Sequence, residues 1–288
     1  MNEDGTIAWS SLLAEASEQV GPSDARRIVE EIAGASPGQI HAILGDLVTE
    51  RGAARFDAMV ARRLAGEPLQ YVLGRWGFRT LDLMVDARVL IPRPETEEVA
   101  GIAIDILTEM SHNVDRELLV ADLGTGSGAI ALSIAAECWS TRVLATDSSP
   151  DALAVARANL TGIGRAATRV SMHEGSWFDA LPSAVEGSLD VIVANPPYVT
   201  DDEVLPPVVA DWEPSMALRA GPDGLDDLRH IVAEAPRWLA PAGVLVLEMA
   251  PDQTETVAQW AQQATMTPTI HVDLAGRPRA VVARKNTE

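Results

Sequence analysis

The sequence predicts an α/β fold with a mostly parallel sheet, preceded by a helical module and a short β-hairpin. Three observations lead to this prediction. From residue 118 onward, short apolar runs alternate with amphipathic segments, the pattern of a parallel sheet covered by helices on both faces. Residues 7–66 instead show only helical spacing of apolar side chains. Residues 75–91 partly alternate apolar and polar residues, as a hairpin does.

Composition limits the class of protein before any motif is considered. The chain has 288 residues, 47% of them hydrophobic, so it can form a large core and an additional module. Its formal net charge of -20 disfavours unaided binding to nucleic-acid backbones, because phosphate contacts need clustered cations. The single cysteine, Cys138, excludes an intrachain disulfide and is typical of a reducing compartment. The five histidines show no metal-ligand spacing, so we expect no metal site.

We expect a cytoplasmic protein that does not enter the membrane. No apolar run reaches the roughly 18 residues that a membrane-spanning helix needs. Residues 1–6 carry acids and lack the basic start of a signal peptide.

Four helices are expected in the N-terminal module. Apolar residues at helical spacing, bounded by proline and glycine, place them at about 9–16, 22–34, 36–52 and 56–66. Their short connections favour a compact bundle of antiparallel neighbours. A purely structural cap and a partner-docking module explain this pattern equally well.

Residues 75–90 are expected to form a β-hairpin linker between an N-terminal domain, 1–74, and a larger C-terminal domain, 91–288. Pro94 suits the first turn of a helix that runs to about residue 110. Glu95 and Glu97 in that turn have two explanations. They interact favourably with the helix dipole, or they line the mouth of a site.

The C-terminal domain is expected to alternate strands and helices. The apolar runs predict strands at 118–123, 143–146, 170–173, 191–194, 244–248, 270–273 and 280–283. Amphipathic stretches predict helices after Gly128 and at 150–160, 225–239 and 254–264.

A glycine-rich turn, Gly124-Thr125-Gly126-Ser127-Gly128, lies between the first of these strands and a helix. Glycines let a ligand approach the backbone, and a helix start favours a carboxylate or phosphate. The spacing G-x-G-x-G differs from the dinucleotide pattern G-x-G-x-x-G/A, the rival interpretation. Asp147 ends the next strand, where an acid can accept hydrogen bonds from both ribose hydroxyls; capping the following helix is the alternative. Together the turn and Asp147 predict a nucleoside-cofactor site.

Asn195-Pro196-Pro197-Tyr198 follows the apolar strand 191–194 directly. Two prolines cannot donate to a sheet and fix φ, so the chain must leave the sheet here in a stiff turn. Ligands of open α/β sheets bind at the carboxyl ends of the strands. An ordinary turn is the alternative, but the glycine-rich turn and Asp147 favour a second ligand site.

With these motifs in place, the chain closely resembles the release-factor glutamine methyltransferases (the PrmC/HemK type), which belong to the class I S-adenosylmethionine-dependent methyltransferases. The resemblance covers essentially the whole chain. Besides the two motifs and Asp147, it is carried by the stretches 66–71, 90–97, 177–178, 213–214 and 221–225.

The resemblance implies a Rossmann-like, seven-stranded domain that uses S-adenosyl-L-methionine. Gly124, Thr125, Gly126, Ser127 and Gly128 would then hold the methionine end of the cofactor. Asp147 would hold its ribose, and Trp177 would lie by its adenine. One departure stands beside Trp177, because Ser176 replaces an acid that is frequent in the family.

For the substrate, the resemblance implies that Asn195, Pro196, Pro197 and Tyr198 bind a glutamine, with Asn195 also near the cofactor. An amide nitrogen is a poor nucleophile and must be held in line with the methyl group. The Asn195 oxygen and the Pro196 carbonyl are acceptors that can hold its N–H groups and stabilise developing positive charge. The substrate would be the Gly-Gly-Gln loop of peptide chain release factors, docked by residues 1–74, and we expect a monomer.

Three alternatives stay open. An adenine-N6 nucleic-acid methyltransferase would use the same tetrapeptide on a flipped base, but the acidic charge and the N-terminal resemblance disfavour it. A glutamine methyltransferase of a ribosomal protein is a nearer alternative. A cofactor-binding protein without activity is the third.

Overall fold

The computed structural model describes residues 7–36 and 38–287. The chain forms two compact units. The first extends to Arg75 and includes Leu205–Trp212, and the second comprises Trp76–Val204 and the chain from Glu213 onward. None of the helices among the described residues combines the length and the apolar composition that crossing a bilayer requires.

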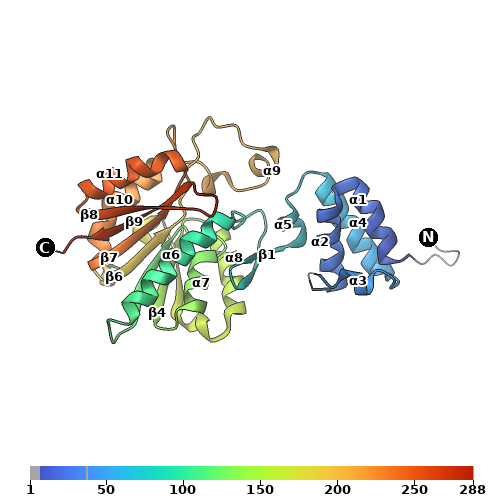
Figure 1. Cartoon of the computed structure of the whole chain (residues 1–288), viewed down its shortest axis with the longest axis horizontal. Helices are drawn as coiled ribbons and strands as arrows, with labels where there is room; N and C mark the ends of the chain where they lie inside the picture. The colour runs from blue at the N-terminus through green and yellow to red at the C-terminus, as the bar shows by residue number, and fades with distance from the viewer. Residues whose placement is uncertain (1–6, 37, 288) are drawn as a thin grey trace. The chain divides into compact units, whose positions relative to one another are not determined.

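The first unit is helical (Figure 1). Its helices are α1 (Trp9–Val20), α2 (Pro22–Ala33), α3 (Ile40–Ile43), α4 (Glu50–Leu64), α5 (Leu69–Leu73) and α9 (Pro207–Ala210). The apolar stripes of α1, α2 and α4 pack into one core around Ile28 and Phe56. Pro22 occupies the first turn of α2, and Gly34 ends that helix at a left-handed φ of 66°, as predicted.

The third helix is shorter than predicted, and the predicted end at Gly52 is wrong. α3 covers only Ile40–Ile43; of its predicted start at Ser36-Pro37, Pro37 lies outside the described residues. Thr49 explains the difference, since its hydroxyl accepts a hydrogen bond from the Gly52 N–H at 3.0 Å and starts α4. The N-cap at Thr49 therefore starts a new helix at a position where the spacing of apolar residues predicts the end of the preceding one.

A hairpin of β1 (Arg75–Phe78) and β2 (Leu81–Met84), of which all but Arg75 belongs to the second unit, precedes one large sheet. The sheet has the strand order β5-β4-β3-β6-β7-β9-β8. Its strands are β3 (Leu118–Leu123), β4 (Thr141–Asp147), β5 (Val170–Glu174), β6 (Leu189–Ala194), β7 (Leu239–Glu248), β8 (Met266–Val272) and β9 (Pro278–Lys285). β9 runs antiparallel to both of its neighbours, β7 and β8, whereas the pairs that join β5, β4, β3, β6 and β7 are parallel. The predicted α/β fold with a helical region and a hairpin is therefore confirmed.

Helices cover both faces of this sheet (Figure 1). α6 (Pro94–Ser111) and α7 (Ala129–Glu137) pack on one face, and α10 (Asp226–Trp238) and α11 (Thr254–Gln263) pack on the other. α8 (Pro150–Leu160) connects β4 to the edge strand β5. The central strand β6 is buried along its whole length, which explains why residues 191–194 read as an unbroken apolar run.

The register of the central strands brings distant residues to one edge. Leu123 at the end of β3 pairs with Thr146 of β4 and with Ala194 of β6. The next residue on each strand is Gly124, Asp147 or Asn195. Because the strands are parallel, these three residues leave the sheet side by side, at the point where the strand order reverses direction.

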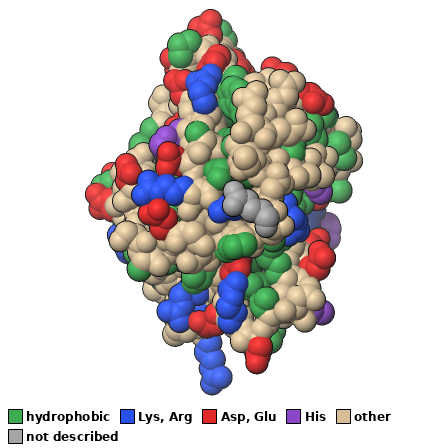
Figure 2. All heavy atoms as spheres, turned by 90° about the vertical axis from the view of Figure 1, so that its left-hand side faces the viewer, with side chains coloured by type: hydrophobic (Ala, Val, Ile, Leu, Met, Phe, Trp, Pro, Cys, Tyr) green, Lys and Arg blue, Asp and Glu red, His purple; other side chains and the backbone are tan. Residues whose placement is uncertain are grey.

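Figure 2 shows the side of the larger unit on which β8 lies, with basic and acidic side chains interspersed. The described side chains on this face therefore form no extended basic surface of the kind that a nucleic-acid backbone needs.

Candidate active site

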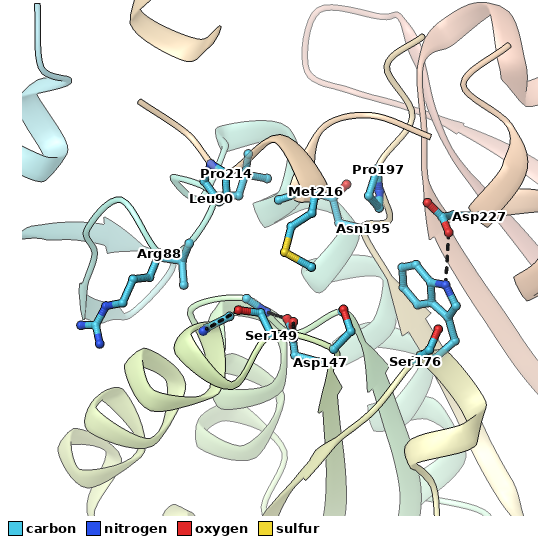
Figure 3. Close-up of a pocket in the computed structure, with 17 residues that line it drawn as sticks. Arg88, Leu90, Asp147, Ser149, Ser176, Asn195, Pro197, Pro214, Met216 and Asp227 are labelled. Carbon is cyan, nitrogen blue, oxygen red and sulfur yellow. Dashed lines mark hydrogen bonds between the residues drawn. The ribbon is translucent and has the colours of Figure 1, made fainter. Parts of the chain in front are cut away.

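A cavity of about 250 Å³ opens at the carboxyl edge of the sheet, above β3, β4 and β6 (Figure 3). Its lining comes from the segment after the hairpin, from the glycine-rich turn, from the turn after β6 and from residues 214–217. Asp227 and Ser176 lie at one end of the cavity and Arg88 at the other, and Met216 points into it from above (Figure 3).

The glycine-rich turn has the conformation that its sequence demands. Gly124, Gly126 and Gly128 all have left-handed φ values, of 73°, 55° and 86°. A Cβ on Gly128 would lie 2.9 Å from Cδ1 of Leu132, so this position needs glycine for helix packing. Gly124 and Gly126 line the cavity, whereas Thr125, Ser127 and Gly128 do not.

Asp122, at the end of β3, holds this turn from below. Its Oδ2 accepts hydrogen bonds from the Thr125 hydroxyl at 2.6 Å and from the Ala131 N–H at 3.0 Å. Burial raises the pKa of Asp122 to about 6. Thr125 therefore shapes the turn through Asp122 and does not face the cavity.

Asp147 lines the cavity next to the turn. Its Oδ2 accepts a hydrogen bond from the Gly126 N–H at 2.8 Å, and its Oδ1 accepts one from the Ser149 N–H at 2.9 Å. Burial raises its pKa, and these N–H groups oppose that rise. Each carboxylate oxygen keeps further lone-pair capacity, so both can still accept hydrogen bonds from two hydroxyl groups of a ligand. The cap of α8 is the Ser149 hydroxyl, which leaves Asp147 free of that role.

The turn after β6 places Asn195 and Pro197 on the cavity wall, whereas Pro196 and Tyr198 lie outside the lining. Its backbone is fixed from another segment, since Gln253 donates from Nε2 to the Tyr198 carbonyl at 3.0 Å. A Cβ on Gly224 would lie 2.4 Å from that carbonyl oxygen, so the packing here needs glycine. These contacts make the turn rigid beyond the stiffness of its prolines.

The Asn195 side chain is oriented by Thr96, in the first turn of α6. Asn195 Nδ2 donates to Thr96 Oγ1 at 3.1 Å, and its Oδ1 accepts no hydrogen bond from a described residue. Glu248, at the end of β7, is fully buried near Thr96, and neither of its oxygens accepts a regular hydrogen bond among the described residues. Burial raises the pKa of Glu248 to about 7, and the nearby Thr96 hydroxyl offsets only part of the rise.

Trp177 forms one end of the cavity with an unusual backbone. Its φ is 45°, in the left-handed region that an aromatic residue rarely adopts. A Cβ on Gly124 would lie 3.1 Å from Cζ3 of Trp177, so the ring stands close against the glycine-rich turn. Its Nε1 donates to Asp227 Oδ1 at 3.2 Å, the contact drawn in Figure 3.

An ion pair between the buried Glu213 and the partly exposed Arg93 joins two segments of the upper wall of the cavity. Glu213 accepts hydrogen bonds from the Ile91 N–H at 3.1 Å and from the Arg93 guanidinium at 2.5 Å. These contacts join the segment that carries Leu90 to the loop that carries Met216, and both line the cavity. Removing one partner would leave a buried charge unpaired, so the pair fixes the shape of this wall.

The structure thus brings Gly124, Gly126, Asp147, Trp177 and Asn195 together with Pro197 around one cavity. Glu95 and Glu97 do not line it. Sequence reasoning missed Met216, Thr96 and Asp227. In the sequence, Asp227 stands out only as one of two adjacent acids at the start of α10. Acids in the first turn of a helix are equally well explained by their favourable interaction with the helix dipole.

Comparisons with known families identify the class of protein. Residues 7–74 match the family model of the PrmC N-terminal domain, and residues 103–211 match that of the methyltransferase small domain. The fold, the cavity at the strand ends and this match together define a methyltransferase.

Relatives of known name narrow the class further. The release factor glutamine methyltransferase of Streptomyces coelicolor is 39% identical over 95% of this chain and 94% of its own. That of Cereibacter sphaeroides is 38% identical over 94% of each chain. The chain belongs to the release factor glutamine methyltransferase family, as its sequence motifs predict.

Solved structures agree on the fold. The catalytic domain of hMettl16, solved in complex with an RNA hairpin, covers 88% of this chain and 90% of its own, with a TM-score of 0.53 and 13% identity. The T. Thermophilus 16S rRNA N2 G1207 methyltransferase covers 74% of this chain and 50% of its own, with a TM-score of 0.52 and 16% identity. At these identities the likeness extends to the fold alone.

Proposed function

We propose that this enzyme transfers a methyl group from S-adenosyl-L-methionine to the side-chain amide nitrogen, N5, of the glutamine in the Gly-Gly-Gln loop of peptide chain release factors. We further propose that it acts as a cytoplasmic monomer. The observation that carries the proposal is the meeting of Asn195 and Pro197 with Asp147 and the glycine-rich turn around one cavity. The residues proposed to hold the cofactor thereby lie next to those proposed to hold the glutamine amide.

The cavity residues fit this cofactor. Asp147 is an acceptor-only side chain, as two ribose hydroxyls require, and Trp177 offers a planar wall for a base. The turn at Gly124 and Gly126 lets backbone approach the methionine end, whose carboxylate is favoured near the start of α7. Once bound, the cofactor supplies an electrophilic methyl group on a sulfonium.

Asn195 is proposed to bind the glutamine amide that receives the methyl group. Its Nδ2 is held by Thr96, so its Oδ1 can accept an N–H of the glutamine amide. The Pro196 carbonyl would take the second N–H, and both oxygens stabilise the positive charge that develops on the nitrogen. The nitrogen proton becomes acidic only after methyl transfer, so water can remove it and no strong base is needed. The stiff turn needs little reorganisation as the charge develops.

Residues 1–74 are proposed to dock the release factor. The match to the PrmC N-terminal domain supports this role. A groove between α1 and α4 presents the exposed Leu64 beside the polar side chains of Glu15, Gln19 and Asp57, and gives this unit a surface that can contact a protein.

The test is label transfer from methyl-labelled cofactor into purified release factor by the wild-type enzyme and by Asn195→Ala. We expect wild type to label the release factor, and Asn195→Ala to lower turnover at least roughly 100-fold, as the loss of one charge-stabilising contact does. S-adenosylhomocysteine affinity should stay close to wild type in this variant. Near-normal turnover of Asn195→Ala would exclude the assigned role of Asn195.

The alternatives predict other acceptors in the same assay. Label in adenine of nucleic acid would indicate the N6 methyltransferase, and label in a ribosomal protein would indicate the other glutamine methyltransferase. Cofactor binding without transfer to any of these would indicate an inactive binding protein.

A further inference from the structure

We propose that Asp227 recognises the base of the cofactor by accepting a hydrogen bond from the exocyclic amine of adenine. It would thereby select a 6-amino purine over a 6-oxo purine. This inference rests on the proposed cofactor and adds a specificity residue that the sequence motifs do not contain.

The position of Asp227 supports this role. It lies in the first turn of α10 and lines the end of the cavity that Ser176 also lines (Figure 3). Trp177, which offers the planar wall for a base, donates its indole N–H to Asp227 Oδ1. The Asp227 carboxylate therefore lies beside the edge of the indole ring. A base stacked on the face of that ring would have its own polar edge near this carboxylate.

The wall itself is fixed, so the base has a defined place. Trp177 is held at a left-handed φ of 45°, with its six-membered ring against Gly124. Its indole N–H is bound to Asp227, which limits rotation of the ring. A site whose wall and acceptor are both held in place can read the edge of a planar ligand.

The chemistry of the available groups determines what is read. Asp227 Oδ1 is bonded to the indole, whereas Oδ2 has no hydrogen-bond donor among the described residues. An ionised carboxylate only accepts, so its ligand partner must be a donor, and the 6-amino group of adenine is one. The Ser176 hydroxyl can both donate and accept, so it cannot distinguish an amine from a carbonyl.

The surroundings act on the charge of this carboxylate in opposite directions. The start of α10 favours a negative charge. Desolvation and the neighbouring charge of Asp226 raise the pKa of Asp227, while the Trp177 hydrogen bond and His230 oppose the rise. Asp226 itself is committed elsewhere, in an ion pair with Arg229 at 2.9 Å.

The experiment compares binding of S-adenosylhomocysteine and of its 6-oxo analogue, S-inosylhomocysteine, by titration calorimetry. We expect wild type to bind the adenine form at least roughly 10-fold more tightly, since a carbonyl facing a carboxylate leaves both acceptors unpaired. Asp227→Asn should abolish or reverse this preference, because its amide can donate to a 6-oxo group. Asp226→Asn is the matched control and should keep the wild-type ratio.

A second variant separates recognition from support of the indole. Trp177→Phe removes the indole N–H and leaves the Asp227 carboxylate, so the preference for adenine should persist even if both affinities fall. The inference is overturned if Asp227→Asn weakens both ligands equally and keeps the wild-type ratio, or if the ratio is lost in Trp177→Phe. Failure of wild type to bind S-adenosylhomocysteine at all would overturn the proposed function as well.

Discussion

The side-chain amide of Asn195 is held by the hydroxyl of Thr96, with Nδ2 and Oγ1 3.1 Å apart. Thr96 is buried and comes from α6, far from Asn195 in the sequence. Because the N–H side of the amide is bound to Thr96, the oxygen side is the one left for a substrate. Thr96 is therefore a positioning residue for the amide that we propose accepts the glutamine N–H.

Replacement of Thr96 should separate this role from simple packing. Thr96→Val keeps the shape but removes the acceptor, so we expect kcat to fall about 10-fold, the effect of losing one hydrogen bond that orients a reacting group. Thr96→Ser keeps the hydroxyl and should remain near wild type. S-adenosylhomocysteine affinity, measured by calorimetry, should be unchanged in both. Equal kcat values for the valine and serine variants would contradict the positioning role.

Asp147 should determine cofactor affinity. Asp147→Asn removes the charge and half of the acceptor capacity, so we expect S-adenosylhomocysteine to bind about 10- to 100-fold more weakly, as for lost hydrogen bonds to a charged group. Asp151→Asn, in the first turn of α8, is an exposed control that should bind as wild type does. Unchanged affinity in Asp147→Asn would show that the ribose is held elsewhere.

Glu248 should make stability depend on pH. Burial raises its pKa from 4.5 to about 7, so between these values the folded chain holds a proton that the unfolded chain has released. Its contribution to the free energy of unfolding is therefore complete below pH 4.5 and is lost as the pH rises through 7. The loss amounts to about 3 kcal/mol.

The isosteric variant Glu248→Gln cannot ionise, so it should escape this loss. Urea unfolding of both proteins at several pH values isolates the effect of Glu248, because other titrating groups such as Asp122 contribute equally to both. We expect the variant to gain stability relative to wild type as the pH rises from 4.5 to above 7. A difference that does not grow over this range would show that Glu248 titrates normally.

Two exposed leucines test the docking role of the N-terminal domain. Leu64 lines the groove between α1 and α4 and is 55% exposed, whereas Leu47 is 57% exposed and lies outside the groove. We expect Leu64→Asp to raise KM for the release factor about 10-fold, from the loss of one buried leucine contact, and Leu47→Asp to leave it unchanged. Cofactor affinity should equal that of wild type in both variants. If the two variants have the same KM for the release factor, the release factor does not dock on the groove that Leu64 lines.

The sequence was sufficient to locate the residues that follow a strand directly. Gly124, Asp147 and Asn195 each come after an apolar run that reads as a buried parallel strand, and parallel strands end at one edge. Their proximity therefore follows from local pattern and fold class together. The stiff turn at Pro196-Pro197 was predictable for the same reason, since the loss of N–H donors is a property of the residue itself.

Contacts between distant segments could not be predicted in this way. Asp226 and Asp227 are chemically identical neighbours at a helix start, yet one pairs with Arg229 and the other with Trp177. Helix rotation against the sheet decides which acid faces the cavity, and no local pattern records it. The same holds for Thr96, which sequence reasoning passed over in favour of the acids beside it.

The central claim is that the methyl group is placed on a glutamine side-chain amide. The direct measurement is tandem mass spectrometry of a purified release factor after incubation with this enzyme and methyl-labelled cofactor. The account predicts fragment ions that place one labelled methyl group on the glutamine of the Gly-Gly-Gln loop, and none when that glutamine is replaced. Labelled methyl groups on any other residue, with that glutamine unmodified, would contradict it.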